Sequence, residues 1–162
     1  MLNIKIICVG KIKENDLQSL QNEYLKRISR YAKIDVVEIE DEKLPSNLPD
    51  GQISRIKDIE CKKIKEKIDT LSNPEVFFLD LKGKQYSSED FATKLSDVAT
   101  YSSSTIVFVI GGSLGLTDEL LSISSNKICF SKMTFPHQLI RIFLLEQIFR
   151  AFKIQNNERY HH

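Results

Sequence analysis

One arginine lies in a segment that is otherwise almost entirely apolar. Pro136 begins a predicted helix that continues to about Phe152, and proline suits a first helical turn because its missing N–H would have no partner there. Arg150 can pair with Glu146, four residues earlier, whereas Arg141 has no partner at this spacing. Arg141 is therefore either a ligand-binding guanidinium or an arginine whose charged end reaches water past an apolar surface.

The apolar character of this helix extends around its whole circumference. A surface helix would show an apolar stripe opposite a polar face. This helix is therefore expected to be buried, either in the core of one chain or between two subunits.

A glycine-rich segment, residues 111–115 (GGSLG), follows an apolar run at residues 105–110. Glycines let backbone N–H and C=O groups approach a ligand closely, although they serve equally in an ordinary tight turn. The spacing is not G-x-G-x-x-G, and no acidic residue lies about 20 positions further on in the expected unit. The segment therefore gives poor support for a dinucleotide site.

A loop at residues 131–135 (SKMTF) connects the last predicted strand to the apolar helix. Ligands of parallel sheets bind beyond the carboxyl ends of the strands, so this loop is a candidate binding segment, together with residues 79–83 and 110–112. His137, in the first turn of the helix, is either a base or simply a polar residue at a helix start. The histidines and carboxylates show no metal-ligand spacing, and the chain contains neither a serine elbow nor a P-loop.

The chain as a whole alternates between patterns typical of strands and of helices. Strands are predicted at residues 3–9, 34–40, 75–81, 105–110 and 127–130. Helices are predicted at residues 15–32, 52–71, 87–99, just after 117, and 136–152, with Asn15, Ser87 or Ser88, and Thr117 as caps. This alternation predicts a parallel sheet with helices on both faces, an α/β/α sandwich.

The composition is that of an ordinary globular protein. The chain has 162 residues, 41% of them hydrophobic and 28% charged, which predicts one domain covering residues 1–162. A net charge of +1 argues against a protein held to nucleic acid by bulk charge, but not against a local basic patch. Cys8, Cys61 and Cys129 are far apart and predict reduced thiols in a cytoplasmic protein. No apolar run is long enough to cross a membrane.

Several segments, taken together, form a specific pattern. Residues 107–116 (VFVIGGSLGL) and 130–154 (FSKMTFPHQLIRIFLLEQIFRAFKI), closed by Tyr160 and His161, resemble the ribosomal large subunit methyltransferase H family within the SPOUT class of knotted RNA methyltransferases. Residues 3–14 (NIKIICVGKIKE) and 76–92 (VFFLDLKGKQYSSEDFA) match as well. The resemblance therefore covers essentially the whole chain.

This resemblance implies a fold and an activity. The expected fold is a SPOUT methyltransferase fold with a C-terminal trefoil knot, and the expected assembly is a homodimer, which would suit the helix that is apolar all round. The implied reaction transfers a methyl group from S-adenosylmethionine to N3 of a pseudouridine in 23S rRNA, on the assembled ribosome. The methyl donor is a sulfonium, so the resemblance implies no metal.

The resemblance also assigns individual residues. The positions that match the family's cofactor-binding residues are Leu79, Gly111, Phe130, Ser131, Lys132, Met133, Thr134 and Phe135. The positions that match residues near the target base are Arg141, Tyr160 and His161. Arg159 departs from the family pattern, which has a small residue or proline there, and could contact an RNA phosphate. His162 is either native or the remnant of a purification tag.

The chemistry of the implied reaction suits these residue types. An arginine near the base carbonyls would stabilise the anion formed when N3 loses its proton, and a histidine could accept that proton. Contacts with RNA are expected from local basic residues, namely Lys11, Lys13, Lys82, Lys84, Lys132 and Arg159. Two other functions stay open, a small-molecule nucleotide-binding enzyme on an unknotted sheet and a non-catalytic ribosome-binding module.

Overall fold

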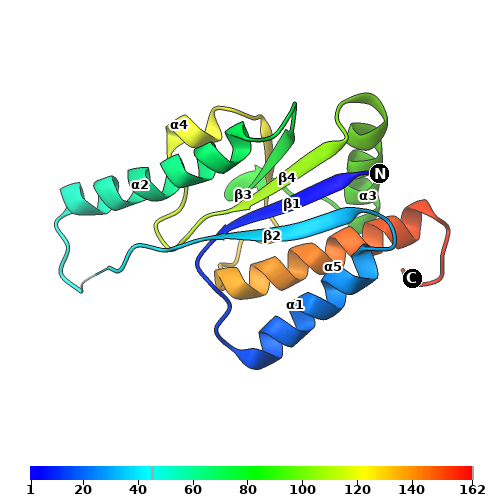
Figure 1. The fold of residues 1–162 in the computed structure, drawn as a ribbon, viewed down its shortest axis with the longest axis horizontal. Coiled ribbons are helices and arrows are strands. Elements are labelled where there is room, and N and C mark those ends of the chain that lie inside the picture. Colours follow the sequence, from blue (N-terminus) through cyan, green and yellow to red (C-terminus); the bar gives the residue numbers. More distant parts are fainter. Residues whose placement is uncertain (45, 162) are drawn as a thin grey trace.

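The computed structural model describes residues 1–44 and 46–161, in which strands and helices alternate along the chain (Figure 1). The strands are β1 (Asn3–Val9), β2 (Lys33–Ile39), β3 (Glu75–Lys84), β4 (Thr105–Ile110) and β5 (Asn126–Ile128). The helices are α1 (Asn15–Ile28), α2 (Asp50–Asp69), α3 (Ser88–Tyr101), α4 (Asp118–Leu121) and α5 (His137–Gln155). The predicted order of elements is confirmed.

The five strands form one sheet in the order β2-β1-β4-β3-β5, and every pairing is parallel. In the middle of the sheet, β1 and β4 are almost wholly buried, as their apolar sequences predict. After β1 the chain enters α1 on one face, and after β4 it enters α4 on the other face. The connections that leave these two neighbouring strands therefore diverge to opposite faces of the sheet.

Helices cover both faces of the sheet. In Figure 1, α2 and α4 lie above the sheet, and α1 and α5 lie below it. Ile28 of α1, Leu95 of α3 and Ile148 of α5 share one core, whereas Ile64 of α2 and Leu120 of α4 belong to the core on the opposite face. The predicted α/β/α sandwich is confirmed.

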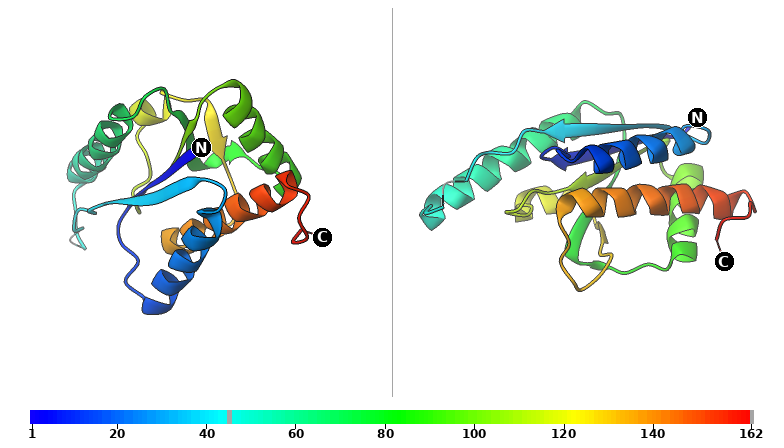
Figure 2. Two further views of the ribbon diagram at one scale, coloured as in Figure 1. Left: turned by 45° about the vertical axis from the view of Figure 1, so that its right-hand side comes forward. Right: turned by 90° about the horizontal axis from the view of Figure 1, so that it is seen from below.

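The apolar helix, α5, runs alongside α1 (Figure 2) and also packs against α3. Leu144, Leu145, Ile148 and Phe152 are all buried in the core that α5 shares with these two helices. Most of the apolar surface of α5 is therefore covered within one chain. Phe143 is the large apolar residue of α5 that remains exposed, with 41% of its surface accessible.

The end of β3 differs from the prediction. The strand predicted at residues 75–81 is longer in the structure, because β3 continues to Lys84, with an irregular register against β5. Gly83 lies so close to β5 that a Cβ atom there would be 2.6 Å from the carbonyl carbon of Lys127. This glycine therefore permits the close approach of two backbones rather than a turn.

The helix starts were predicted with mixed success. Ser87 and Thr117 cap α3 and α4 as expected, each accepting a hydrogen bond from a backbone N–H in the first turn. Asn15 is the first residue of α1, and Glu14 precedes it without a side-chain cap bond, so the cap predicted for Asn15 is wrong. Pro136 precedes α5 with extended ψ rather than lying in its first turn.

Among the described residues, no helix has both the length and the apolar character required to cross a bilayer.

Candidate functional site

A cavity of about 270 Å³ opens at the carboxyl ends of β3, β4 and β5. Its lining includes these residues that the family resemblance assigns to the cofactor: Leu79, Gly111, Phe130, Ser131, Met133, Thr134 and Phe135. They come from three separate strand ends, and the parallel sheet brings them together. We call this space the first cavity.

Lys132 is the one assigned cofactor residue that does not line the first cavity. It is exposed in the loop between Ser131 and Met133. Its ammonium group is therefore available to a partner outside the cavity.

The glycine-rich segment forms a tight turn on the wall of the first cavity. Gly112 and Gly115 are joined by a backbone hydrogen bond of 3.0 Å, and Gly115 has a φ of +79°, a conformation that favours glycine. A Cβ atom at Gly111 would lie 3.0 Å from the side chain of Leu116, another lining residue. The segment is therefore a tight turn whose glycines also line the first cavity, and its contact with a ligand stays a prediction.

His137 also lines the first cavity, at the start of α5. Its ring packs against Gly10, where a Cβ atom would lie 3.1 Å from the ring, and its buried Nδ1 atom has no hydrogen-bond partner. Burial and the nearby charge of Arg141 lower the pKa of His137. At neutral pH this histidine is therefore a neutral imidazole at the cavity wall.

Arg141 lies in a different environment from the one expected. Its side chain is fully buried and lines neither of the cavities described here. Nη1 donates hydrogen bonds to Glu38 Oε2 at 2.8 Å and to Gln21 Oε1 at 3.2 Å, and Nη2 donates to the carbonyl oxygen of Gly10 at 3.2 Å. The expectation of an arginine that reaches water is wrong, because Glu38 of β2 and two other groups hold the guanidinium inside the protein.

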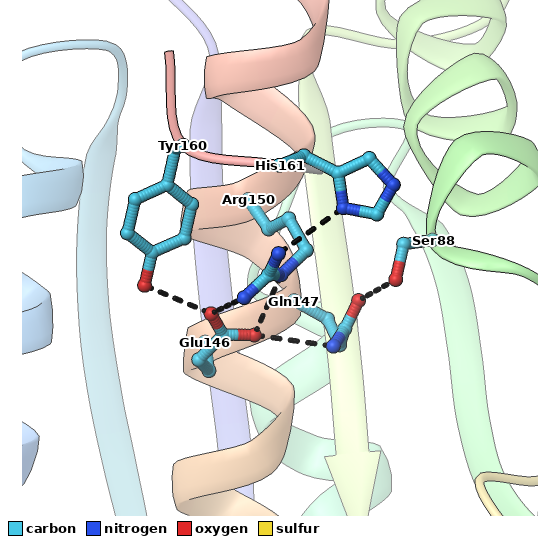
Figure 3. A network of polar contacts seen from close by, with 6 residues as sticks. All are labelled: Ser88, Glu146, Gln147, Arg150, Tyr160 and His161. Carbon is cyan, nitrogen blue, oxygen red and sulfur yellow. Dashed lines mark hydrogen bonds and ion pairs between the residues drawn. The ribbon is translucent and has the colours of Figure 1, made fainter.

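Tyr160 and His161 belong to a polar network on the surface of α5, which we call the tail network (Figure 3). Tyr160 Oη donates to Glu146 Oε1 at 2.9 Å, and Arg150 binds both oxygens of the same carboxylate. The ion pair predicted between Glu146 and Arg150 is thus confirmed. Arg150 Nη1 lies 3.1 Å from Nδ1 of His161, whose Nε2 contacts Glu89.

Protonation states in the tail network follow from these contacts. Burial and the hydrogen bond to Glu146 raise the pKa of Tyr160 to about 12, so its hydroxyl keeps its proton at neutral pH. Arg150 can only donate, so Nδ1 of His161 must be the acceptor and Nε2 carries the proton that faces Glu89. That hydrogen bond lowers the pKa of Glu89.

A second cavity, of about 410 Å³, adjoins the first. The two share Ile128, Phe130, Ser131 and Phe135 in their linings. Polar groups of the second cavity come from the start of α3, namely Ser87 and Ser88, and from the middle of α5, namely Glu146 and Gln147. Sequence reasoning missed this cavity because no local pattern indicates that these two helices meet there.

The described part of the chain contains no group of three or more histidine, cysteine or acidic side chains placed to hold a metal ion. All three cysteines are free, as predicted, and all three are buried. Burial raises the pKa of Cys8 to about 12, so its thiol stays protonated and unreactive.

Solved structures with a similar fold include two bacterial proteins. A protein from Haemophilus influenzae Rd KW20, described as a probable methylase family protein, has a TM-score of 0.54 and 14% identity, covering 99% of this chain and 71% of that chain. A candidate RNA methyltransferase from Bacillus anthracis has a TM-score of 0.53 and 10% identity, covering 98% of this chain and 99% of that chain. At such identities the similarity shows the fold alone, a parallel sheet with helices on both faces.

The sequence comparisons are more specific. The family model described as "Predicted SPOUT methyltransferase" matches residues 2–161. Proteins named Ribosomal RNA large subunit methyltransferase H, from Bacillus thuringiensis (strain Al Hakam) and from Bacillus anthracis, are 49% identical over 160 residues, which is 99% of each chain. The chain therefore belongs to the SPOUT methyltransferases and, among them, to the ribosomal RNA large subunit methyltransferase H family, as its motifs predict.

Proposed function

We propose that the protein transfers the methyl group of S-adenosylmethionine to N3 of a pseudouridine in 23S rRNA, on the assembled ribosome. One observation carries this proposal. The first cavity collects every residue that the family resemblance assigns to the cofactor, except Lys132. The printed name of the relatives supports ribosomal RNA of the large subunit as the substrate.

The first cavity suits S-adenosylmethionine chemically. Gly111 lies on one wall, where a Cβ atom would be only 3.0 Å from Leu116, so a side chain there would crowd the lining of the cavity. Leu79 and Phe135 offer apolar surface to an adenine ring, and the turn at residues 111–115 brings backbone groups to the wall. When bound, S-adenosylmethionine supplies an electrophilic methyl group.

N3 of the base must lose its proton, and the tail residues Tyr160 and His161 are the groups considered for this transfer. Tyr160 keeps its own proton, so it can donate a hydrogen bond but cannot act as the base. His161 can accept a proton only at Nδ1, which Arg150 occupies in the tail network. We therefore assign proton acceptance to His161 after Nδ1 separates from Arg150, with Arg150 then free to contact the RNA.

The role of Arg141 at the target base stays a prediction. Its guanidinium already binds Glu38, Gln21 and Gly10, and it would have to leave at least one of them to reach the base. An arginine held in this way can also stabilise the site indirectly, because the Gly10 backbone that it binds packs against His137.

We further propose that residues 1–162 act as a single domain, as a homodimer, and in the cytoplasm where ribosomes are found. Phe143, exposed on an otherwise buried helix, supports a contact with a second copy. The C-terminal trefoil knot that the family implies stays a prediction.

The decisive experiment is a methyl-transfer assay. Ribosomes from a bacterial strain that lacks its own enzyme of this family are incubated with the protein and tritiated S-adenosylmethionine, and the position of the methyl group is mapped on 23S rRNA. We expect one methyl group at N3 of one pseudouridine, and far less transfer to free 50S subunits. Calorimetry with S-adenosylmethionine and with dinucleotides tests the cofactor separately. Absence of transfer to any ribosomal preparation would refute the proposal.

A further inference from the structure

We propose that the second cavity receives the target base after it has flipped out of the RNA, and that Ser88 and Gln147 recognise it there. This inference rests on the proposed function, and it adds the location and the recognising side chains of the acceptor. It concerns residues that the motif comparison does not assign to the site.

The first argument is position. Methyl transfer requires the acceptor nitrogen within roughly 3–3.5 Å of the methyl carbon, so the pocket for the base must adjoin the pocket for the donor. The second cavity shares the lining residues Phe130, Ser131 and Phe135 with the first. A ligand in one cavity would therefore lie next to a ligand in the other. The first cavity has a volume of about 270 Å³ and the second about 410 Å³. Because the first is assigned to the cofactor, the second is available for the nucleotide.

The second argument is the chemistry of the walls. Enzymes that modify a base hold the flipped base between aromatic or apolar side chains and read its edge with hydrogen bonds. Aromatic rings form one part of the second cavity, including Phe135 and Phe143, whose ring centroids lie 5.7 Å apart in a T-shaped arrangement. Polar groups from Ser88, Glu146 and Gln147 form another part.

The third argument is charge. Among the lining residues of the second cavity, Glu146 is the one charged side chain, and neither lysine nor arginine is present. Such a space is unsuited to a phosphate group but suited to an uncharged planar ring. This favours the base over the RNA backbone as the occupant.

The polar groups are arranged to meet the edge of a uracil ring. Ser88 Oγ donates to Gln147 Oε1 at 2.7 Å, and Gln147 Nε2 donates to Glu146 Oε2 at 3.1 Å (Figure 3). Arg150 and Tyr160 hold Glu146 in place, so Glu146 in turn orients the amide of Gln147. Glu146 is therefore a positioning residue for the recognising amide.

Two carbonyl oxygens flank N3 of the base, and each requires a donor. The hydroxyl of Ser88 can rotate from Gln147 to one carbonyl, and the second N–H of the Gln147 amide can donate to the other. The base would thus replace a contact between two protein groups without leaving a buried donor unpaired. A base with an amino group in place of one carbonyl would set its own N–H donor against the Ser88 or Gln147 donor, and its binding would be disfavoured.

The test compares Gln147→Leu, which removes the amide at similar size, with Ser88→Ala and with Gln52→Leu as a control. Gln52 lies exposed near the start of α2, outside both cavities. We expect each cavity variant to lower kcat/KM for ribosomes by roughly 3- to 10-fold, the usual effect of one lost neutral hydrogen bond. Calorimetry should give wild-type affinity for S-adenosylmethionine, and the control should match the wild type in both assays.

Other outcomes overturn the inference. Wild-type kcat/KM in both cavity variants, with folding verified by circular dichroism, would show that the base binds elsewhere. An equal loss of S-adenosylmethionine affinity and transfer rate would assign the second cavity to the donor. Failure of the wild-type protein itself to methylate ribosomes would instead refute the proposed function, and this inference with it. Ser88→Ala alters only the first residue of α3, so it keeps the test available if Gln147→Leu does not fold.

Discussion

At the scale of single residues, Gly111 lies on the wall of the proposed cofactor site and has no side chain. We expect Gly111→Val to lower S-adenosylmethionine affinity by roughly 10-fold or more, because the added methyl groups would crowd a packed wall. The chain should stay folded, since the nearest atoms, 3.0 Å from a Cβ, belong to the side chain of Leu116, which can move. Calorimetry measures the affinity.

Gly51→Val is the matched control for this variant. No atom lies within 4 Å of a Cβ placed at Gly51, and this glycine is exposed. Unchanged affinity in a folded Gly111→Val protein would remove the glycine turn from the cofactor site.

Arg141 combines complete burial with three hydrogen-bond acceptors. We expect Arg141→Ala to lower the free energy of unfolding by about 2–3 kcal/mol. The loss should be below that of a wholly buried ion pair, because water can reach the Glu38 carboxylate, whose side chain is 36% exposed. Urea denaturation measures the loss, and Arg141→Lys should recover only part of it because lysine lacks the planar fork.

Arg55→Ala, on the exposed surface of α2, controls for the removal of an arginine. An Arg141→Ala protein of wild-type stability that no longer methylates ribosomes would point to direct contact with the target base. A protein that is destabilised but methylates at the wild-type rate, when assayed below its unfolding temperature, would make the role purely structural.

At the scale of elements, the approach of β3 to β5 depends on Gly83. A Cβ there would lie 2.6–2.7 Å from backbone atoms of Lys127 and Ile128, and a backbone cannot move aside as a side chain can. We expect Gly83→Ala to lower the free energy of unfolding by about 1–3 kcal/mol, the usual cost of overpacking. Urea denaturation of Gly83→Ala beside Gly51→Ala tests this, and equal stability of the two variants would contradict the close approach.

At the scale of the whole molecule, the proposed homodimer needs an apolar surface outside the core. A charge at Leu144 would not test it, because Leu144 is fully buried within one chain and its replacement would unfold the protein. Phe143 is exposed, so Phe143→Asp should leave the fold intact and convert a dimer into monomers. Sedimentation at micromolar concentration measures the mass, with Tyr101→Asp as a control at another exposed aromatic residue. A monomeric wild-type protein would rule out the dimer.

Binding to RNA must depend on a few local charges, because the net charge is only +1. Lys132 is exposed in the loop whose other residues line the first cavity, and two of them, Ser131 and Phe135, also line the second. We expect Lys132→Ala to weaken ribosome binding and to reduce the salt dependence of the affinity by about one phosphate contact. Lys62→Ala, at an exposed position of α2 outside both cavities, should do neither.

The measurement is ribosome affinity over a series of salt concentrations, with calorimetry for S-adenosylmethionine alongside it. A Lys132→Ala protein that loses cofactor affinity but keeps its salt dependence would instead support the cofactor role implied by the family resemblance.

The sequence alone determined the features that depend on neighbouring residues. Apolar runs and helical spacing predicted the order of elements and the parallel sheet, because these patterns follow from local backbone geometry. The caps at Ser87 and Thr117 and the pair of Glu146 with Arg150 span three or four positions, and all were predicted. The cofactor positions came from motifs shared with a family, and the common edge of the sheet explains why they meet.

Only the tertiary structure decided which distant groups meet. Arg141 pairs with Glu38, 103 positions away, and no pattern around either residue indicates the other. The apolar surface of α5 is the same whether a partner subunit or α1 and α3 cover it, so the sequence left that choice open. The second cavity likewise depends on the packing of α3 against α5, which brings Ser88 next to Gln147. Contacts of this kind depend on how layers pack, which local periodicity does not encode.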